Sequence, residues 1–551
     1  MKHSLHIVQA ICAAVFFCTF RIGAAADQES LATNPVIPGF NPDPSVCRAG
    51  DDYYLATSSF EYFPGVPIYH SRDLAHWEMV GHALSTREQL DLTGVRPSGG
   101  IFAPTLRFHN GVFYMINVLI GSPLHKGIFV VTATDPAGPW SMPHWIEGAR
   151  GIDPSLFFDD DGTAWLCANR SPENKVHDKH REIWIQKLNL ETFQLEGPEG
   201  TLDSGPYFAN GRLGSVNNFE APHLYKKNGW YYLLLSHGGT SLNHAVSIWR
   251  SKSPLGHWEE NPSNPILTHR GEHPSGLTCT GHADLVEIGD GTWWMVLLGV
   301  RDEKGKSPMG RETFLTPVDW SGPWPLVNPG SHSGRVDLLF TPPRLATSPV
   351  PPPGFKTDFK EPVLSKQWNF IRTPRSDQWE LKNRLGWLTL RLGPEQLTGD
   401  GQPGFLGIRV TQPSFRAETR VDFQPWDESG CAGLAILRSP TACFLLVIER
   451  KGEDRFASVY QGIDLRASMT IPGQGPIDLS MDLKNNLLTF SVREQSGEWK
   501  TLLQDLDAST LSTDEGGRFT GSMIGLYGSS RGKISEESAS FDFFDYSPDQ
   551  H

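Results

Sequence analysis

Short apolar segments separated by Gly, Asp and Asn turns recur between residues 33 and 345. Each unit joins one apolar segment to a second across a tight turn, as a β-hairpin does. In five units, spaced 50 to 70 residues apart, an aromatic residue stands 11 or 12 positions after the first residue. The units are Asp43–Tyr54, Phe102–Tyr114, Asp153–Trp165, Glu220–Tyr232 and His282–Trp294. Hairpins repeated at this spacing predict the blades of a five-bladed β-propeller.

The first residue of each unit differs in character from the apolar residues that follow it. Four of the five are ionisable, namely Asp43, Asp153, Glu220 and His282. If each unit is a blade, these residues share one position on the innermost strands and meet around one axis. A single Asp-Pro pair usually belongs to a turn, but the shared position relative to the hairpin turns favours a common site. Three acids and a histidine at one site predict proton-transfer chemistry.

The pattern changes after residue 346. Thr347–Gly354 is rich in proline, which predicts a stiff linker over residues 347–356 that follows a catalytic propeller at 27–346. Beyond the linker, Phe415–Phe423 alternates between two faces like a strand buried on one side. Further strands are expected at Trp387–Leu392, Gly433–Leu437, Phe444–Ile448, Ile524–Tyr527 and Phe541–Tyr546. Because no long helical period occurs, the chain is predicted to be all-β, with a β-sandwich at 357–551.

Charge and the N-terminal segment narrow the possible partners. The formal net charge of −14 argues against nucleic-acid binding, which requires basic patches. Lys2 and His3 precede an apolar run at Ile7–Phe20 and small residues at Gly23–Ala26. This arrangement predicts a secretory signal peptide over residues 1–26 and an exported protein, secreted or periplasmic. No later run is apolar and long enough to cross a bilayer, so no membrane partner is expected.

Six motifs stand in a specific order along the rest of the chain. They are Asn34–Ser45, Ser58–Tyr69, Gly151–Phe157, Phe219–Tyr225, Gly281–Leu285 and Gly310–Glu312. Together they resemble glycoside hydrolase family 43, most closely its two-domain β-xylosidase branch, whose C-terminal sandwich is concanavalin-like. The resemblance covers essentially the whole chain after the predicted signal peptide.

The resemblance implies an exo-acting, inverting glycoside hydrolase that releases terminal β-D-xylose from xylo-oligosaccharides or xylan. It leaves open whether α-L-arabinofuranose is also released, and an α-L-arabinofuranosidase that debranches arabinoxylan or arabinan is the alternative. An endo-arabinanase is less favoured, because in this branch the C-terminal domain helps to close a one-ended pocket. A non-catalytic carbohydrate-binding propeller is also less favoured, because such a protein is expected to have lost an acid. Oligomeric state stays open, a homo-oligomer included.

The resemblance assigns a role to each acid. Asp43 is the expected general base that activates water, and Glu220 is the expected general acid that protonates the leaving oxygen. Asp153 is expected to raise the pKa of Glu220 by like-charge repulsion and to orient it. Inversion requires room for a water molecule, so the two working carboxyl groups should lie ~6.5–9.5 Å apart.

The resemblance also implies residues that bind the sugar. Arg311 is expected to contact sugar hydroxyls, Phe60 to form an apolar wall and Thr240 to line the pocket. Phe102 stands where close relatives usually carry tryptophan and is expected to offer a smaller ring for sugar stacking. His282 is expected either to hydrogen-bond near the base or to hold a structural Ca²⁺ through water, and the chemistry itself requires no cofactor. A loop of the sandwich, with candidates in Phe519–Gly525, is expected to reach the pocket rim.

Overall fold

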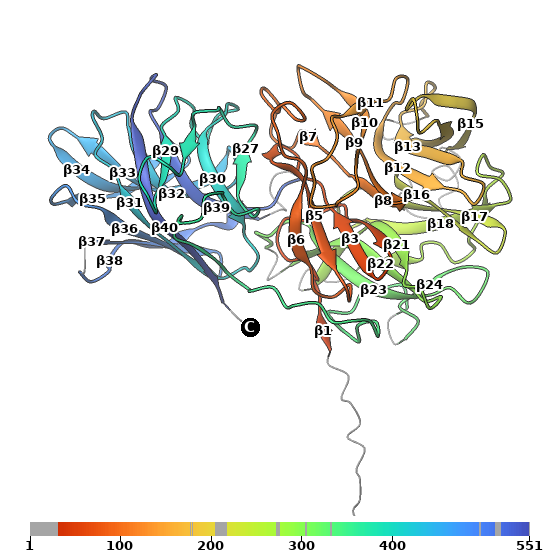
Figure 1. Ribbon diagram of the computed structural model, residues 1–551. Coiled ribbons are helices and arrows are strands. Elements are labelled where there is room, and N and C mark those ends of the chain that lie inside the picture. The colour runs from red at the N-terminus through yellow and green to blue at the C-terminus, as the bar shows by residue number, and fades with distance from the viewer. Residues whose placement is uncertain are drawn as a thin grey trace, which may run out of the picture.

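The computed structural model describes residues 31–549 except 177, 179, 204–217, 272–275, 303–305, 331–332, 495–496 and 513–518. The predicted signal peptide lies outside the described residues. The described part consists of strands and one short 3₁₀ helix, η1 (Ser509–Leu511), arranged as two domains side by side (Figure 1). No helix among the described residues has the length and apolar character needed to cross a bilayer.

Five antiparallel sheets form the blades of the first domain. The first blade contains β2 (Ser45–Ala49), β3 (Asp52–Ala56), β5 (Gly65–Ser71) and β6 (Glu78–Leu84). The second contains β7 (Gly100–Ile101), β8 (Thr105–His109), β9 (Val112–Ile120), β10 (Gly127–Ala133) and β11 (His144–Trp145). The third contains β12 (Ile152–Phe158), β13 (Ala164–Arg170), β14 (Glu182–Leu188) and β15 (Leu195–Asp203). The fourth contains β16 (Phe219–Lys227), β17 (Trp230–His237), β18 (Ala245–Ser251), β19 (Glu259–Glu260) and β20 (Leu267–Thr268). The fifth contains β21 (Leu277–Glu287), β22 (Trp293–Arg301), β23 (Glu312–Asp319) and β24 (Leu326–Val327).

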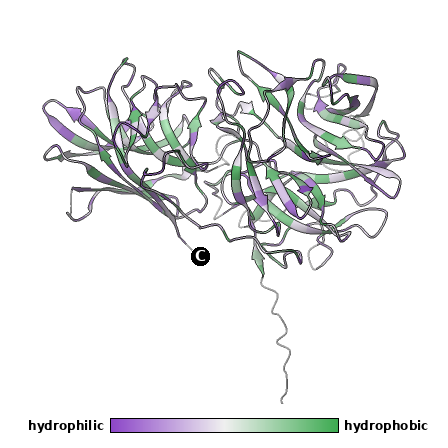
Figure 2. Cartoon of the chain, in the orientation of Figure 1, coloured by the Kyte–Doolittle hydropathy of each residue, from purple (hydrophilic) through white to green (hydrophobic). Residues whose placement is uncertain are grey.

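The predicted all-β, five-bladed propeller is confirmed. Each predicted hairpin forms the first two long strands of a blade, and β2, β8, β12, β16 and β21 surround the axis as inner strands. Apolar residues recur along the strands of both domains (Figure 2). A short pair of strands, β1 (Ala32–Thr33) and β25 (Leu339–Phe340), joins the two ends of this domain.

The second domain is the predicted β-sandwich, made of two eight-stranded sheets. One sheet contains β26 (Phe355–Thr357), β28 (Trp379–Glu380), β29 (Leu388–Arg391), β31 (Phe415–Asp422), β36 (Ile477–Lys484), β37 (Leu487–Glu494), β38 (Lys500–Asp507) and β40 (Ser538–Pro548). The other contains β27 (Asn369–Ile371), β30 (Gly404–Arg409), β32 (Cys431–Ser439), β33 (Ala442–Lys451), β34 (Asp454–Gln461), β35 (Asp464–Ile471), β39 (Met523–Ser529) and β4 (Tyr62–Phe63). Strand β31 alternates buried and half-buried residues along its whole length, as its sequence predicts.

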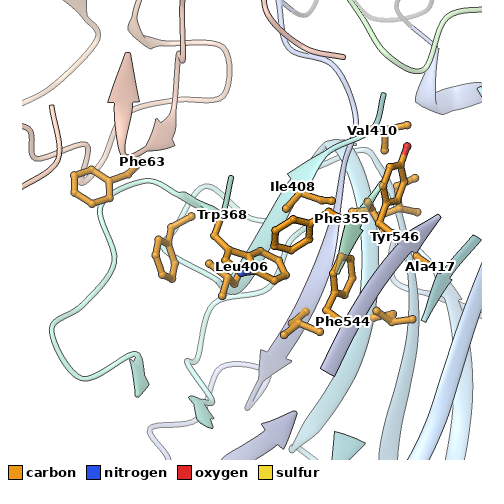
Figure 3. Packing of buried hydrophobic residues seen from close by; sticks show 14 of the residues in the cluster. Phe63, Phe355, Trp368, Leu406, Ile408, Val410, Ala417, Phe544 and Tyr546 are labelled. Carbon is orange, nitrogen blue, oxygen red and sulfur yellow. The ribbon is translucent and has the colours of Figure 1, made fainter. Parts of the chain in front are cut away.

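Strand β4 belongs by sequence to the propeller but completes a sheet of the sandwich. It pairs with β27, so that Phe63 lies opposite Phe370 and Tyr62 opposite Ile371. Phe63 is 7% exposed and belongs to the same apolar cluster as the sandwich core around Trp368 (Figure 3). The two domains therefore share both a sheet and a core.

Candidate active site

The four ionisable residues that begin the hairpins lie together at one end of the propeller axis. Nδ1 of His282 lies 3.4 Å from Oδ1 of Asp43. The backbone N–H of Ala221, the neighbour of Glu220, donates to Oδ2 of Asp153 over 3.1 Å. The charge of Asp43 acts on the pKa values of both other acids. Residues from four blades thus form one charged cluster.

Local backbone distortion turns these side chains out of the regular strand pattern. Asp43, Asp153 and His282 have left-handed φ values of 56°, 52° and 47°. The pairing register is also interrupted in β12, β16 and β21 at the site residues. Such bulges redirect single side chains and occur often beside active sites.

Asp43 is held as a carboxylate by positive and polar neighbours. Arg311 donates from Nη1 to its Oδ1 over 2.7 Å, and the hydroxyl of Ser58 donates to its Oδ2 over 2.6 Å. Burial favours the neutral acid, but the charges of Arg311 and His282 and the Ser58 hydrogen bond outweigh it, so the pKa of Asp43 is lowered. Asp43 is therefore ready to accept a proton from a bound water at ordinary pH.

Asp153 and Glu220, in contrast to Asp43, have raised pKa values. Burial, followed by the negative charges of Glu220 and Asp43, raises the pKa of Asp153 well above its ordinary value. Burial also raises the pKa of Glu220, and the charge of Asp43 adds to it against a hydrogen bond from Asn218. Because the two acids are close like charges, they titrate as a pair that retains a proton to higher pH than an isolated carboxyl group.

The segment that carries Asp43 is fixed from both domains. The buried carboxylate of Glu312 accepts from Gly39 N–H over 2.7 Å and from Nε of Arg301 over 2.7 Å. Arg301 also donates to the backbone carbonyl of Thr411 in the sandwich over 3.0 Å. In the other direction, Nε of the sandwich residue Arg409 donates to the carbonyl of Phe40 over 2.7 Å. Docking of the sandwich therefore helps to position the Asp43 segment.

Three aromatic rings form an apolar wall beside Arg311. The ring of Phe60 lies 5.1 Å from that of Phe102 and 5.7 Å from that of Phe519, measured between centroids. The guanidinium of Arg311 lies 5.6 Å from the rings of Phe60 and Phe519 and donates to the carbonyl of Phe519 over 3.2 Å. Phe519 belongs to the sandwich and lies in the loop predicted to reach the pocket.

A close backbone approach brings this sandwich loop to Arg311. Gly310 has a φ of +76°, and a Cβ atom there would lie 2.8 Å from the Cα of Gly521. A Cβ on Gly521 would lie 2.0 Å from the carbonyl oxygen of Met309. Only glycine fits at both positions, so the two loops can pack backbone to backbone.

His282 and His244 are both buried beside Asp43. The backbone N–H of His282 donates to Ser236 Oγ over 2.6 Å, and burial lowers the pKa of its ring. Burial lowers the pKa of the neighbouring His244 to about 3. Within the described residues no three His, Cys, Asp or Glu side chains are grouped as metal ligands. The guanidinium of Arg311 already neutralises Asp43, so these residues do not fit a directly ligated Ca²⁺.

One predicted site residue remains to be placed, and several polar residues that were not predicted lie beside the acids. Thr240 is exposed in the turn between β17 and β18, and its place in the pocket stays a prediction. Asn169, which donates to Asp153 over 3.0 Å, and Asn218, beside Glu220, were not predicted. Ser58 was predicted only as part of a motif. Polar residues at these offsets carry no sequence signal of their own, because only the fold brings them to the acids.

The cluster combines the groups that hydrolysis of a polar, uncharged substrate requires. It has an ionised carboxylate, Asp43, and a carboxyl pair that retains a proton. Nε of Arg311 is buried and has no hydrogen-bond partner among the described residues, so the guanidinium beside Asp43 keeps an unused donor. The adjoining aromatic wall suits the apolar face of a sugar ring.

Comparison with known proteins agrees with this chemistry. The profile of glycosyl hydrolases family 43 matches residues 32–325, and that of the beta xylosidase C-terminal concanavalin A-like domain matches residues 356–547. A xylosidase/arabinosidase of Butyrivibrio fibrisolvens is 41% identical over 93% of this chain and 99% of its own length. The non-reducing end alpha-L-arabinofuranosidase BoGH43B of Bacteroides ovatus is 37% identical over 93% of this chain and 94% of its own length.

Solved structures show the same two-domain architecture. The structure titled Bacteroides ovatus xyloglucan PUL GH43B superimposes with a TM-score of 0.86 at 36% identity, covering 94% of this chain and 100% of that one. A xylan beta-1,4-xylosidase from Bacillus halodurans C-125 has a TM-score of 0.86 at 33% identity over the same shares. The chain therefore belongs to glycoside hydrolase family 43 and is a glycosidase that carries the C-terminal concanavalin A-like domain of that family's β-xylosidases.

Proposed function

We propose that this glycosidase acts from chain ends with inversion and releases terminal β-D-xylose from xylo-oligosaccharides or xylan. The observation that carries the proposal is the pairing of ionised Asp43 with the proton-retaining Asp153–Glu220 pair beside Arg311. Release of α-L-arabinofuranose is the second candidate activity. It is favoured by the relatives from Butyrivibrio fibrisolvens and Bacteroides ovatus, whose names include arabinosidase and arabinofuranosidase.

In the proposed reaction Asp43 is the general base and Glu220 the general acid. Asp43 takes a proton from a water molecule whose oxygen attacks the anomeric carbon from the face opposite the leaving group. The glycosidic C–O bond breaks as Glu220 gives its proton to the leaving oxygen. Asp153 keeps the proton on the pair by like-charge repulsion, and one displacement from the opposite face inverts the anomeric centre.

Closure by the sandwich supports action at chain ends. Phe519 contacts Arg311 and Phe60, and its backbone N–H donates to Ser98 Oγ over 3.1 Å. A loop from the second domain thus covers the apolar side of the sugar site. A site walled on that side accommodates one terminal sugar more readily than the middle of a chain.

The substrate is tested with two chromogenic glycosides. Purified protein is assayed on nitrophenyl β-D-xylopyranoside and nitrophenyl α-L-arabinofuranoside, and kcat/KM is compared. We expect hydrolysis of the xyloside, and a higher kcat/KM on the arabinoside would establish the second candidate as the main activity. Protein that hydrolyses neither glycoside but cuts internal bonds of arabinan would contradict the proposal.

Asp153→Asn is expected to reduce kcat/KM severely and to shift its pH profile. Glu220 acts while protonated, so activity falls as pH rises through its pKa. Removing the neighbouring negative charge lowers that pKa, and the alkaline limb should move to lower pH. The measurement is the pH dependence of kcat/KM, with Asp161→Asn, an exposed acid of the same blade, as the matched control. An alkaline limb at the same pH as in the unmodified enzyme would rule out the charge role.

We further propose that no metal is needed for the chemistry and that His282 serves through hydrogen bonding near the base. Exhaustive chelation is then expected to leave both kcat and Tm unchanged. The check is a melting curve and an assay before and after chelation, with metal analysis of the protein. A Tm that falls on chelation and returns only with Ca²⁺ would instead support the water-held calcium ion.

Export is proposed on the N-terminal pattern alone. Expression of the full gene followed by N-terminal sequencing of the mature protein is expected to give a chain that starts near Asp27. Cytoplasmic protein that retains residues 1–26 would contradict export.

A further inference from the structure

A cavity of about 660 Å³ lies at the opposite end of the propeller axis from the acids. Each of the five inner strands contributes to its wall near its C-terminal end. The wall includes Arg48, His109, Phe158, Lys226 and Glu287, with Trp293 from β22. On β12 the wall residue Phe157 follows Asp153 by four positions, which corresponds to roughly 13 Å along a strand. The cavity is therefore separate from the sugar site already described.

A buried polar plug separates the two ends of the axis. Asp284 is fully buried and accepts from Nη1 of Arg107 over 2.7 Å, from the Tyr225 hydroxyl over 2.6 Å and from the Ser45 hydroxyl over 2.8 Å. Burial opposes ionisation, but the charge of Arg107 outweighs it and lowers the pKa of Asp284. Because this network is fixed and closely packed, a sugar in the cavity cannot pass to the acids.

The charged side chains of the cavity wall form ion pairs with one another or with the buried network around Asp284. Nη1 of Arg48 lies 3.7 Å from Glu287, Nζ of Lys226 lies 2.9 Å from Asp160, and Arg107 is paired with Asp284. A compensated wall does not select an anion or a cation. It still offers hydrogen-bond donors and acceptors to a neutral polar ligand.

Aromatic rings in the cavity wall can contact the apolar faces of a sugar ligand. Phe157, Phe158 and Trp293 are half-buried and line the cavity. The ring of Phe158 stacks on that of His109, with centroids 4.3 Å apart and planes at 3°. Paired aromatic and charged groups match the alternating C–H faces and hydroxyl edges of sugars, and the volume lies within the range of ~300–1,000 Å³ typical of ligand sites.

We propose that this cavity is a second, non-catalytic site for a short neutral oligosaccharide. It would hold the enzyme on a polysaccharide while the acids at the other end of the axis process free chain ends. Occupancy does not depend on the proposed sugar specificity of the acids, because the plug isolates the two sites.

The test is calorimetric titration of full-length Glu220→Gln protein with xylotetraose and, separately, cellotetraose. The Glu220→Gln substitution slows turnover of unactivated xylo-oligosaccharides by on the order of 10²–10⁴, so binding is measured with little hydrolysis. We expect two binding events per chain with xylotetraose. In the Glu220→Gln/Trp293→Ala protein the affinity of one of these events should be at least tenfold weaker. Trp230→Ala is the matched control, because Trp230 is half-buried, is covered by Arg250 and Lys252 and does not line the cavity.

Trp293→Ala and Phe158→Ala in the otherwise active enzyme are expected to keep kcat on nitrophenyl β-D-xylopyranoside within twofold, which also reports correct folding. Both should reduce retention of the enzyme on insoluble xylan. If neither Trp293→Ala nor Phe158→Ala weakens any binding event with either tetrasaccharide, the proposal is overturned. Two events with cellotetraose as well would support a site for neutral β-linked glycans in general. If the unsubstituted enzyme does not hydrolyse nitrophenyl β-D-xylopyranoside, that result counts against the proposed function and not against this site.

Discussion

Replacing Glu220 by Gln is expected to lower kcat on xylobiose by on the order of 10²–10⁴, because xylose is a poor leaving group and its oxygen must be protonated as the bond breaks. A nitrophenolate leaves without such help, so the same variant should lose much less activity on nitrophenyl β-D-xylopyranoside. Asp43→Asn removes activation of water and should damage both substrates to a similar extent. The measurement is kcat for both substrates with all three proteins.

Folding and general charge effects are controlled separately. Glu199→Gln changes an acid on the outer part of the third blade, where it pairs with Arg170, and should leave kcat unchanged. Equal melting temperatures would show that the active-site variants are folded. A Glu220→Gln protein that hydrolyses xylobiose at the unmodified rate would refute the assignment of Glu220 as the acid.

Truncation of the chain after Thr347 is expected to give an insoluble or inactive propeller. Strand β4 would lose its partner β27, and the apolar side chain of Phe63 would lose the sandwich core that covers it. Newly exposed apolar surface of this kind favours aggregation. Arg311 would also lose Phe519, and Phe40 would lose Arg409. The measurement is the soluble yield and the kcat of the truncated protein.

A full-length Phe519→Ala protein separates the loss of the pocket wall from the loss of the fold. It should stay soluble with a raised KM, because only the covering ring is removed. The unmodified chain should melt in one transition, since its two domains share a sheet and a core. A soluble truncated protein with full exo-activity on xylobiose would show that the sandwich is an appended module.

The sequence predicts the propeller and its acid cluster because a repeat encodes both. Asp153 and Glu220 fall at the same distance from a hairpin turn, and a repeated strand brings equal positions to one axis. The strict alternation at Phe415–Phe423 likewise predicts β31, because a sheet buried on one face imposes that period. Motif order then adds the roles, which a repeat alone does not specify.

Contacts between distant segments are what the sequence does not reveal. Strand β4 has only two residues, too few for a period, and its partner β27 lies about three hundred positions later. The hydrogen bonds that Gly39 and Arg301 donate to Glu312 depend on how two loops dock, and no motif predicts them. The cavity at the far end of the axis likewise exists only once the five inner strands are assembled.

The most direct test of the proposed mechanism is the configuration of the sugar at the moment of release. Proton NMR of a nitrophenyl β-D-xylopyranoside digest, recorded before mutarotation, follows the anomeric signals of the released xylose, all of which comes from the non-reducing end. Direct attack by water activated by Asp43 predicts that α-D-xylose forms first from the β-linked substrate. First-formed β-D-xylose would mean that a covalent intermediate intervenes, and the assignment of Asp43 and Glu220 as base and acid would be wrong.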